Sequence, residues 1–146
     1  MTILDDIQVI SGKKKNSTPK KETSKKILIV EDEKPLADVL QDELIHQGFE
    51  VFVASNGKEG LEMAISYTPD LILLDLLMPV MDGKTMLHRL RDFPKFKTIP
   101  VIVLTNAGET ENIRETQLYF NASEFLIKSN VSVEQIVTKI KSRLLI

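Results

Sequence analysis

Four short stretches of the chain are apolar at every position. They are 27–30, 71–74, 101–104 and 125–127. Because strands buried on both faces have no polar side, such runs are typical of a parallel sheet covered by helices. A weaker run at 50–54 predicts a fifth strand, nearer an edge of the sheet.

Between these runs the apolar positions recur with helical spacing. We predict helices from Pro35 to Gly48, around 61–65 and ending before Pro69, around 86–90 after Gly83, around 109–119, and from 133 to 144 with Ser132 as the N-cap. The chain thus alternates five strands with five helices. Right-handed crossovers would then give an α/β fold, a doubly wound five-stranded parallel sheet with helices on both faces.

Residues 1–25 differ from the rest of the chain. The stretch 12–26 is rich in Lys, Ser, Thr and Pro and lacks apolar periodicity, which predicts a disordered or linker-like extension. A small apolar patch precedes it, comprising Ile3, Leu4, Ile7, Val9 and Ile10. This patch is either a poorly ordered terminus or a docking segment for a partner. We therefore divide the chain into an extension, 1–25, and one domain, 26–146.

Charge separates the same two parts. The whole chain has a formal net charge of −2, but residues 1–25 contribute +3 and residues 26–146 contribute −5. An acidic domain disfavours non-specific nucleic-acid binding, so we expect no direct DNA binding. Without cysteine, thiolate zinc sites and cysteine nucleophiles are excluded. No apolar run is long enough to span a membrane, and we expect a cytoplasmic protein.

Polar residues follow the predicted strands where a parallel sheet binds its ligands, at the carboxyl edge. They are Glu31, Asp32, Asp75, Thr105 and Lys128. Each alone is compatible with an ordinary cap, loop or surface role. Together, three carboxylates would repel one another unless a cation joined them, and Mg²⁺ prefers such oxygen ligands. A strand-end aspartate beside a hydroxyl and an ammonium group can act as a nucleophile toward phosphorus.

The order and spacing of these residues resemble the receiver domain of two-component response regulators, a flavodoxin-like (βα)5 family. The resemblance covers 26–146 and rests on ILIVEDE, DLILLDLLMPVMDG, VIVLTNAG and FLIK. It implies phosphoryl transfer to Asp75 from a histidine kinase or a histidine phosphotransferase. It also implies Mg²⁺ held by Glu31, Asp32, Asp75 and the backbone carbonyl of Leu77.

The same resemblance implies a conformational switch. Thr105 would hydrogen-bond the phosphoryl group, Lys128 would pair with it, and Phe125 occupies the position of the family's switch aromatic. The signal would then reach the surface of the fourth helix, the fifth strand and the fifth helix. There we expect an unidentified downstream protein to bind, and a phosphorylation-dependent homodimer is a further hypothesis.

Three residues depart from the usual family pattern. Ser129 follows Lys128 where most relatives have a cis proline, so we expect a trans or strained peptide bond there. Asn106 is bulkier than the usual small residue and would restrict access to the phosphoryl group. Leu77 is apolar and would not orient a hydrolytic water, which predicts slow autodephosphorylation.

Two other functions remain open from the sequence. A phosphohydrolase of the haloacid dehalogenase type also uses a strand-end aspartate, but Asp75 lacks the second carboxylate of that family's D-x-D motif. A pseudo-receiver would bind partners without being phosphorylated. Because the sequence stops at Ile146, directly after the last predicted helix, we expect a stand-alone signalling receiver and not a conventional enzyme.

Overall fold

The computed structural model describes residues 2–3, 24–106 and 122–146. Within these ranges the chain forms β1 (Lys26–Val30), α2 (Lys34–His46), β2 (Glu50–Ala54), α3 (Gly57–Tyr67), β3 (Leu71–Asp75), α4 (Gly83–Arg91), η1 (Pro94–Phe96), β4 (Val101–Thr105), β5 (Glu124–Ile127), η3 (Lys128–Asn130) and α6 (Val133–Leu144). The helix predicted around 109–119 lies outside the described residues.

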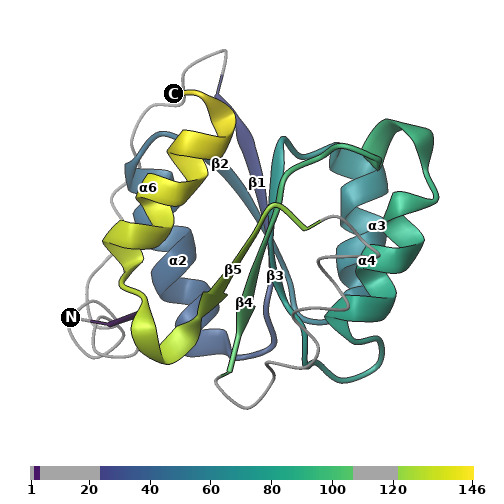
Figure 1. The fold of residues 1–146 in the computed structure, drawn as a ribbon, viewed down its shortest axis with the longest axis horizontal. Coiled ribbons are helices and arrows are strands. Elements are labelled where there is room, and N and C mark those ends of the chain that lie inside the picture. The colour runs from purple at the N-terminus through teal and green to yellow at the C-terminus, as the bar shows by residue number, and fades with distance from the viewer. Residues whose placement is uncertain (1, 4–23, 107–121) are drawn as a thin grey trace.

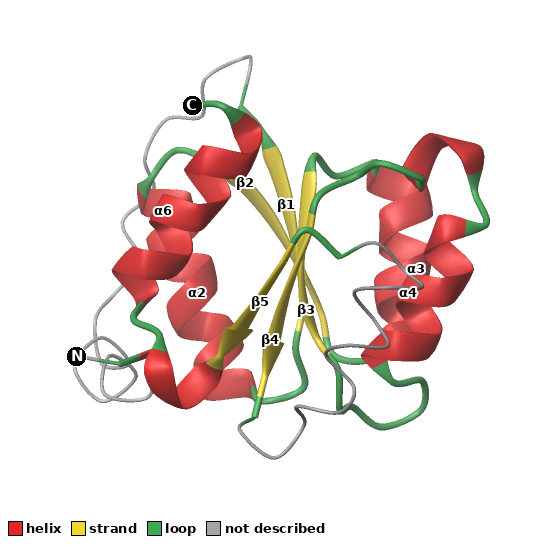
Figure 2. Cartoon of the chain, in the orientation of Figure 1, coloured by secondary structure: helices red, strands yellow, loops and turns green. Residues whose placement is uncertain are grey.

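The five strands form one parallel sheet in the order β2-β1-β3-β4-β5. Helices α2 and α6 cover one face, and α3 and α4 cover the other (Figures 1 and 2). The predicted doubly wound α/β fold is therefore confirmed. None of the helices in the described ranges is long and apolar enough to cross a membrane.

The continuous apolar runs fill two cores, one on each face of the sheet. Alternate residues of a strand point to opposite faces. Ile27 and Ile29 therefore join the core under α2 and α6, whereas Leu28 and Val30 join the core under α3 and α4. The three central strands, β1, β3 and β4, are thus held on both sides and fix the positions of the residues that follow them.

The strand at 125–127 differs from its prediction. All four residues of β5 are only partly buried, so the expectation of a strand buried on both faces is wrong there. The reason is topological, because β5 forms one edge of the sheet and pairs only with β4. Strand β2 forms the other edge, as its weaker pattern predicts.

Hydrogen bonds between neighbouring residues define where the last helix, α6, begins. Ser132 is the N-cap of α6, and its hydroxyl accepts a hydrogen bond from the backbone N–H of Gln135 at 3.1 Å. The Gln135 side chain in turn accepts one from the Ser132 N–H at 2.8 Å. This reciprocal capping box starts the helix at a defined residue and orients the chain between β5 and α6.

Candidate functional site

The polar residues singled out above lie together at the carboxyl edge of the sheet. Register pairing aligns Val30 with Leu74, and Asp75 with Leu104. The side chains that follow β1 and end β3 are thus neighbours. Lys128 follows β5 directly, in the short helix η3, and its ammonium group reaches back across the edge toward the carboxylates.

The ammonium group of Lys128 lies among the carboxylates of this site and provides its positive charge. Only 2% of the residue is exposed, and its Nζ lies 2.7 Å from Glu31 Oε1 and 3.4 Å from Asp75 Oδ2. A third carboxylate, Glu33, is 4.0 Å away and half exposed. A buried ammonium is tolerated when carboxylates compensate its charge, and this arrangement holds both strand-end acids against one donor.

Burial and mutual repulsion shift the protonation of this group. Burial, followed by the charge of Asp75, raises the pKa of Glu31 from 4.5 to about 8, although Lys128 opposes the shift. Burial also raises the pKa of Asp75, again against the attraction of Lys128. Burial alone would lower the pKa of Lys128, but the hydrogen bond and charge of Glu31 and the charge of Asp75 outweigh it. The carboxylates therefore favour an added proton or cation.

The donor set fits a hard divalent cation. Carboxylate oxygens of Glu31, Asp32 and Asp75 lie within 4.8 Å of one another. Glu31 and Asp75 are buried, whereas Asp32 is exposed and opens the cluster to solvent. Mg²⁺ binds through a few carboxylates and keeps several of its waters, so a cluster buried on one side and open on the other suits it.

The loop after β3 is tightly tied to the phosphoacceptor candidate. The Leu77 N–H donates to Asp75 Oδ1 at 3.3 Å, and the Gly83 N–H donates to the Leu76 carbonyl at 2.9 Å. A Cβ at Gly83 would stand 2.0 Å from the Asp75 carbonyl oxygen, so only glycine permits this approach. Asp82 caps α4 by accepting from the Thr85 N–H.

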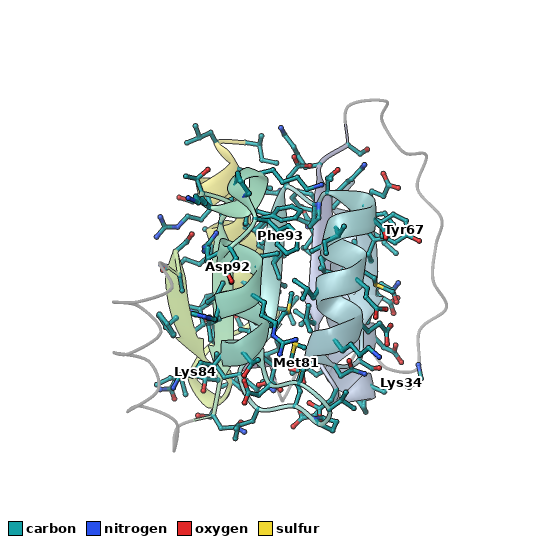
Figure 3. All side chains as sticks on the ribbon, turned by 90° about the vertical axis from the view of Figure 1, so that its right-hand side faces the viewer. Lys34, Tyr67, Met81, Lys84, Asp92 and Phe93 are labelled. Carbon is teal, nitrogen blue, oxygen red and sulfur yellow. The ribbon has the colours of Figure 1, made fainter. Side chains whose placement is uncertain are left out.

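The tip of this loop is anchored to the neighbouring helix. The carbonyl of Met81 accepts the Gly57 N–H at 2.9 Å. In Figure 3, Met81 lies between the ends of α3 and α4. Val80, just before it, has a positive φ of 69° and is 79% exposed, which is an unfavourable backbone for a β-branched residue.

The remaining predicted residues occupy the neighbouring strands. Thr105 ends β4 and is buried, and its hydroxyl donates to the Asn106 carbonyl at 3.4 Å. Asn106 is exposed. Phe125 in β5 is partly buried against the core under α3 and α4. The peptide bond between Lys128 and Ser129 is trans, in agreement with one of the two expected outcomes.

Sequence reasoning missed two residues near the site. Glu33 approaches Lys128, and its backbone N–H donates to Glu31 Oε2 at 3.2 Å. The only sequence signal for Glu33 was its place in the run of three acidic residues at 31–33. Ile3, which belongs to the extension predicted to be disordered or linker-like, is fully buried within the core under α2 and α6, whereas residues 4–23 of that extension lie outside the described residues. Its place in an apolar patch was the only sequence signal.

Comparison with known proteins assigns the chain to a family. The family model described as "Response regulator receiver domain" matches residues 27–141. The chain belongs to this family of signalling domains, which includes receivers of two-component systems.

Individual relatives agree with this assignment. Response regulator ArlR of Staphylococcus saprophyticus is 36% identical over 119 residues, which cover 82% of this chain and 52% of that protein. The chain thus spans about half the length of this curated relative. A response regulator structure from Chloroflexus aurantiacus is 30% identical, with a TM-score of 0.76, and covers 85% of this chain and all of its own.

A more distant structure shares the fold. It is the receiver domain of a sensor histidine kinase from Pseudomonas aeruginosa, described with a magnesium ion coordinated in the active-site cleft. It is 23% identical, has a TM-score of 0.74, and covers 85% of this chain and all of its own.

Proposed function

We propose that this receiver domain accepts a phosphoryl group on Asp75 from a phosphohistidine of a histidine kinase or histidine phosphotransferase. The observation that carries the proposal is the position of Asp75. Its carboxylate is buried beside Lys128, with Oδ2 at 3.4 Å from the ammonium, yet it belongs to a cluster that opens to solvent through Asp32. A nucleophile so placed can be reached at the edge while its charge is compensated from within.

In the transfer, an oxygen of Asp75 attacks phosphorus, the P–N bond to the donor imidazole breaks, and the imidazole takes a proton from solvent. Glu31, Asp32, Asp75 and the carbonyl of Leu77 would hold Mg²⁺. The bound ion would neutralise the charge that develops on the phosphoryl oxygens. Lys128 already faces Asp75 Oδ2 and would stabilise the charge of the acyl phosphate.

The phosphorylated state would alter the neighbouring strands. Thr105 would turn its hydroxyl from the Asn106 carbonyl to the phosphoryl group, and Phe125 would repack on β5. A local charge would thereby change the surface formed by β5 and α6. This surface would bind an unidentified downstream protein or a second copy of the domain.

The lifetime of the phosphoryl group depends on Leu77. This side chain is half exposed and lies two residues beyond Asp75. It has no polar group that could orient a water molecule for hydrolysis. We therefore expect slow autodephosphorylation, which suits a domain that must hold a signal until a partner binds.

Intact mass after incubation with acetyl phosphate and Mg²⁺ tests the proposal. We expect the mass of one added phosphoryl group, lost in Asp75→Asn and retained in Asp38→Asn, a matched change at a partly exposed aspartate of α2. Omission of Mg²⁺ should also prevent the addition. A folded protein that gains no phosphoryl group with Mg²⁺ would instead favour the pseudo-receiver, and catalytic turnover of phosphomonoesters would favour the phosphohydrolase.

A further inference from the structure

Ile3 is a core residue, although it lies 23 positions before β1 begins at Lys26. None of it is exposed, and it belongs to the buried cluster formed with α2 and α6. That cluster includes Leu36 and Leu40 of α2, and Ile136 and Ile140 of α6. The first residues of the chain therefore complete the apolar layer between these helices.

A backbone contact fixes Ile3 at a defined place. Its N–H donates a hydrogen bond to the carbonyl of Val131. Val131 is itself buried and joins η3, which carries Lys128, to the capped start of α6. The contact thus lies three residues from the buried ammonium that faces Glu31 and Asp75.

The residue before Ile3 lies over the same junction. Thr2 lines a hollow of about 600 Å³, together with Asn130, Ser132, Glu134, Gln135, Thr138 and Lys139. In Figure 1 the purple segment, residues 2–3, lies beside the end of α6 that is nearest the carboxyl edge of the sheet. Three observations thus indicate that residues 2–3 are docked on the domain. The Ile3 side chain is buried in the core, its N–H donates to the Val131 carbonyl, and Thr2 lines the hollow.

We propose that Thr2–Ile3 is an intramolecular docking segment. Its Ile3 side chain occupies a socket, the part of the buried cluster that contains Leu36 and Leu40 of α2 and Ile136 and Ile140 of α6. By holding the Val131 carbonyl, the segment fixes the turn that positions Lys128. Ile3 is on this account a positioning residue, since it acts on Lys128 only through the backbone of 128–131. The proposal does not depend on phosphorylation of Asp75.

The docked residues, Thr2 and Ile3, belong to the same chain as the domain. Residues 4–25 link Ile3 at the carboxyl edge to β1, which starts at the opposite edge. A five-residue strand is about 17 Å long, whereas 22 residues span up to about 70 Å, so the link reaches easily. The length of the intervening chain therefore permits docking within one molecule.

Amide hydrogen exchange tests the positioning role. In Ile3→Ser we expect the amides of 129–132 to exchange at least tenfold faster than in the wild type. The amides of β1 and β3 should change less. Ile146→Ser is the matched control, because the same substitution is made at a residue that is 61% exposed. Equal acceleration across the whole sheet, or no acceleration at 129–132, would overturn the proposal.

A milder variant and a label keep the test decisive if Ile3→Ser does not fold. Ile3→Val should give the same local pattern with a smaller acceleration. Because the chain has no cysteine, Thr2→Cys carries a single spin label, which should broaden the amides of Glu134 and Thr138 within one molecule. Broadening seen only between labelled and isotope-enriched molecules would mean exchange of termini and would refute docking in one chain, as would the absence of broadening.

Discussion

The protonation of Glu31 gives a quantitative test of the site. Burial and the neighbouring Asp75 raise its pKa from 4.5 to about 8. Between these values the folded state keeps a proton that the unfolded state has released. The free energy of unfolding must therefore fall as the pH rises through this window, by up to about 1.4 kcal/mol per pH unit.

Glu31→Gln removes this titration while keeping the shape of the side chain. Penetration of water and relaxation of the protein reduce the pH dependence below this limit. We therefore expect the free energy of unfolding of the wild type without Mg²⁺ to fall by about 2–3 kcal/mol between pH 5.5 and 8.5 through Glu31. The variant should lack this loss. Both proteins share the two histidines and the groups away from this site, so the difference between their pH slopes reports the titration of Glu31 together with its coupling to Asp75 and Lys128.

Urea unfolding followed by circular dichroism, in EDTA at several pH values, measures both slopes. Glu62→Gln on the exposed side of α3 is the matched control and should follow the wild type. Added Mg²⁺ should raise the stability of the wild type most at high pH, where no proton competes, and should stabilise Glu31→Gln far less. Equal slopes for the wild type and Glu31→Gln, or a wild type whose stability rises over this range, would show that Glu31 is not protonated in the folded state at these pH values.

Three further changes test the loop after β3. Val80→Gly should increase stability by about 0.5–1 kcal/mol, because it relieves a β-branched residue at positive φ at the cost of a more flexible unfolded chain; a lower urea midpoint would contradict this. Gly83→Ala should lower stability by about 2–3 kcal/mol, since its Cβ would overlap the Asp75 carbonyl oxygen, whereas an unchanged midpoint would show that the loop yields freely. Leu77→Asn should speed loss of the phosphoryl group roughly tenfold by orienting water, as read from the decay of phosphorylated mass, and an unchanged half-life would remove Leu77 as the cause of slow hydrolysis.

The sheet and its edge were predictable because their signals are local. Strands buried on both faces read as unbroken apolar runs, and parallel strands bring their carboxyl ends to one edge, so Asp75 and Lys128 could be placed together from their strand positions alone. Ser132 was likewise predictable as the N-cap, because it stands directly before the helical pattern of 133–144. The partial burial of β5 was not predictable from its composition, because edge position depends on the order of strands in the sheet.

Long-range contacts account for the rest. The apolar patch around Ile3 does not indicate where its side chain packs, because the helices concerned lie more than 30 and 130 residues away. The approach of Glu33 to Lys128 likewise depends on how the loop after β1 turns across the edge. Val80 adopts a positive φ because the loop is tied at both ends, by Leu77 to Asp75 and by Met81 to Gly57, a constraint that no local propensity encodes.

The central claim is that Asp75 itself receives the phosphoryl group. Phosphoramidate, whose P–N bond resembles that of phosphohistidine, can supply the group in the presence of Mg²⁺. Borohydride then reduces the acyl phosphate, and peptide mass spectrometry locates the reduced residue. We predict reduction at Asp75 alone, with none in samples that lack Mg²⁺. Reduction at Asp32, Glu31 or another carboxylate while Asp75 stays unmodified would contradict it.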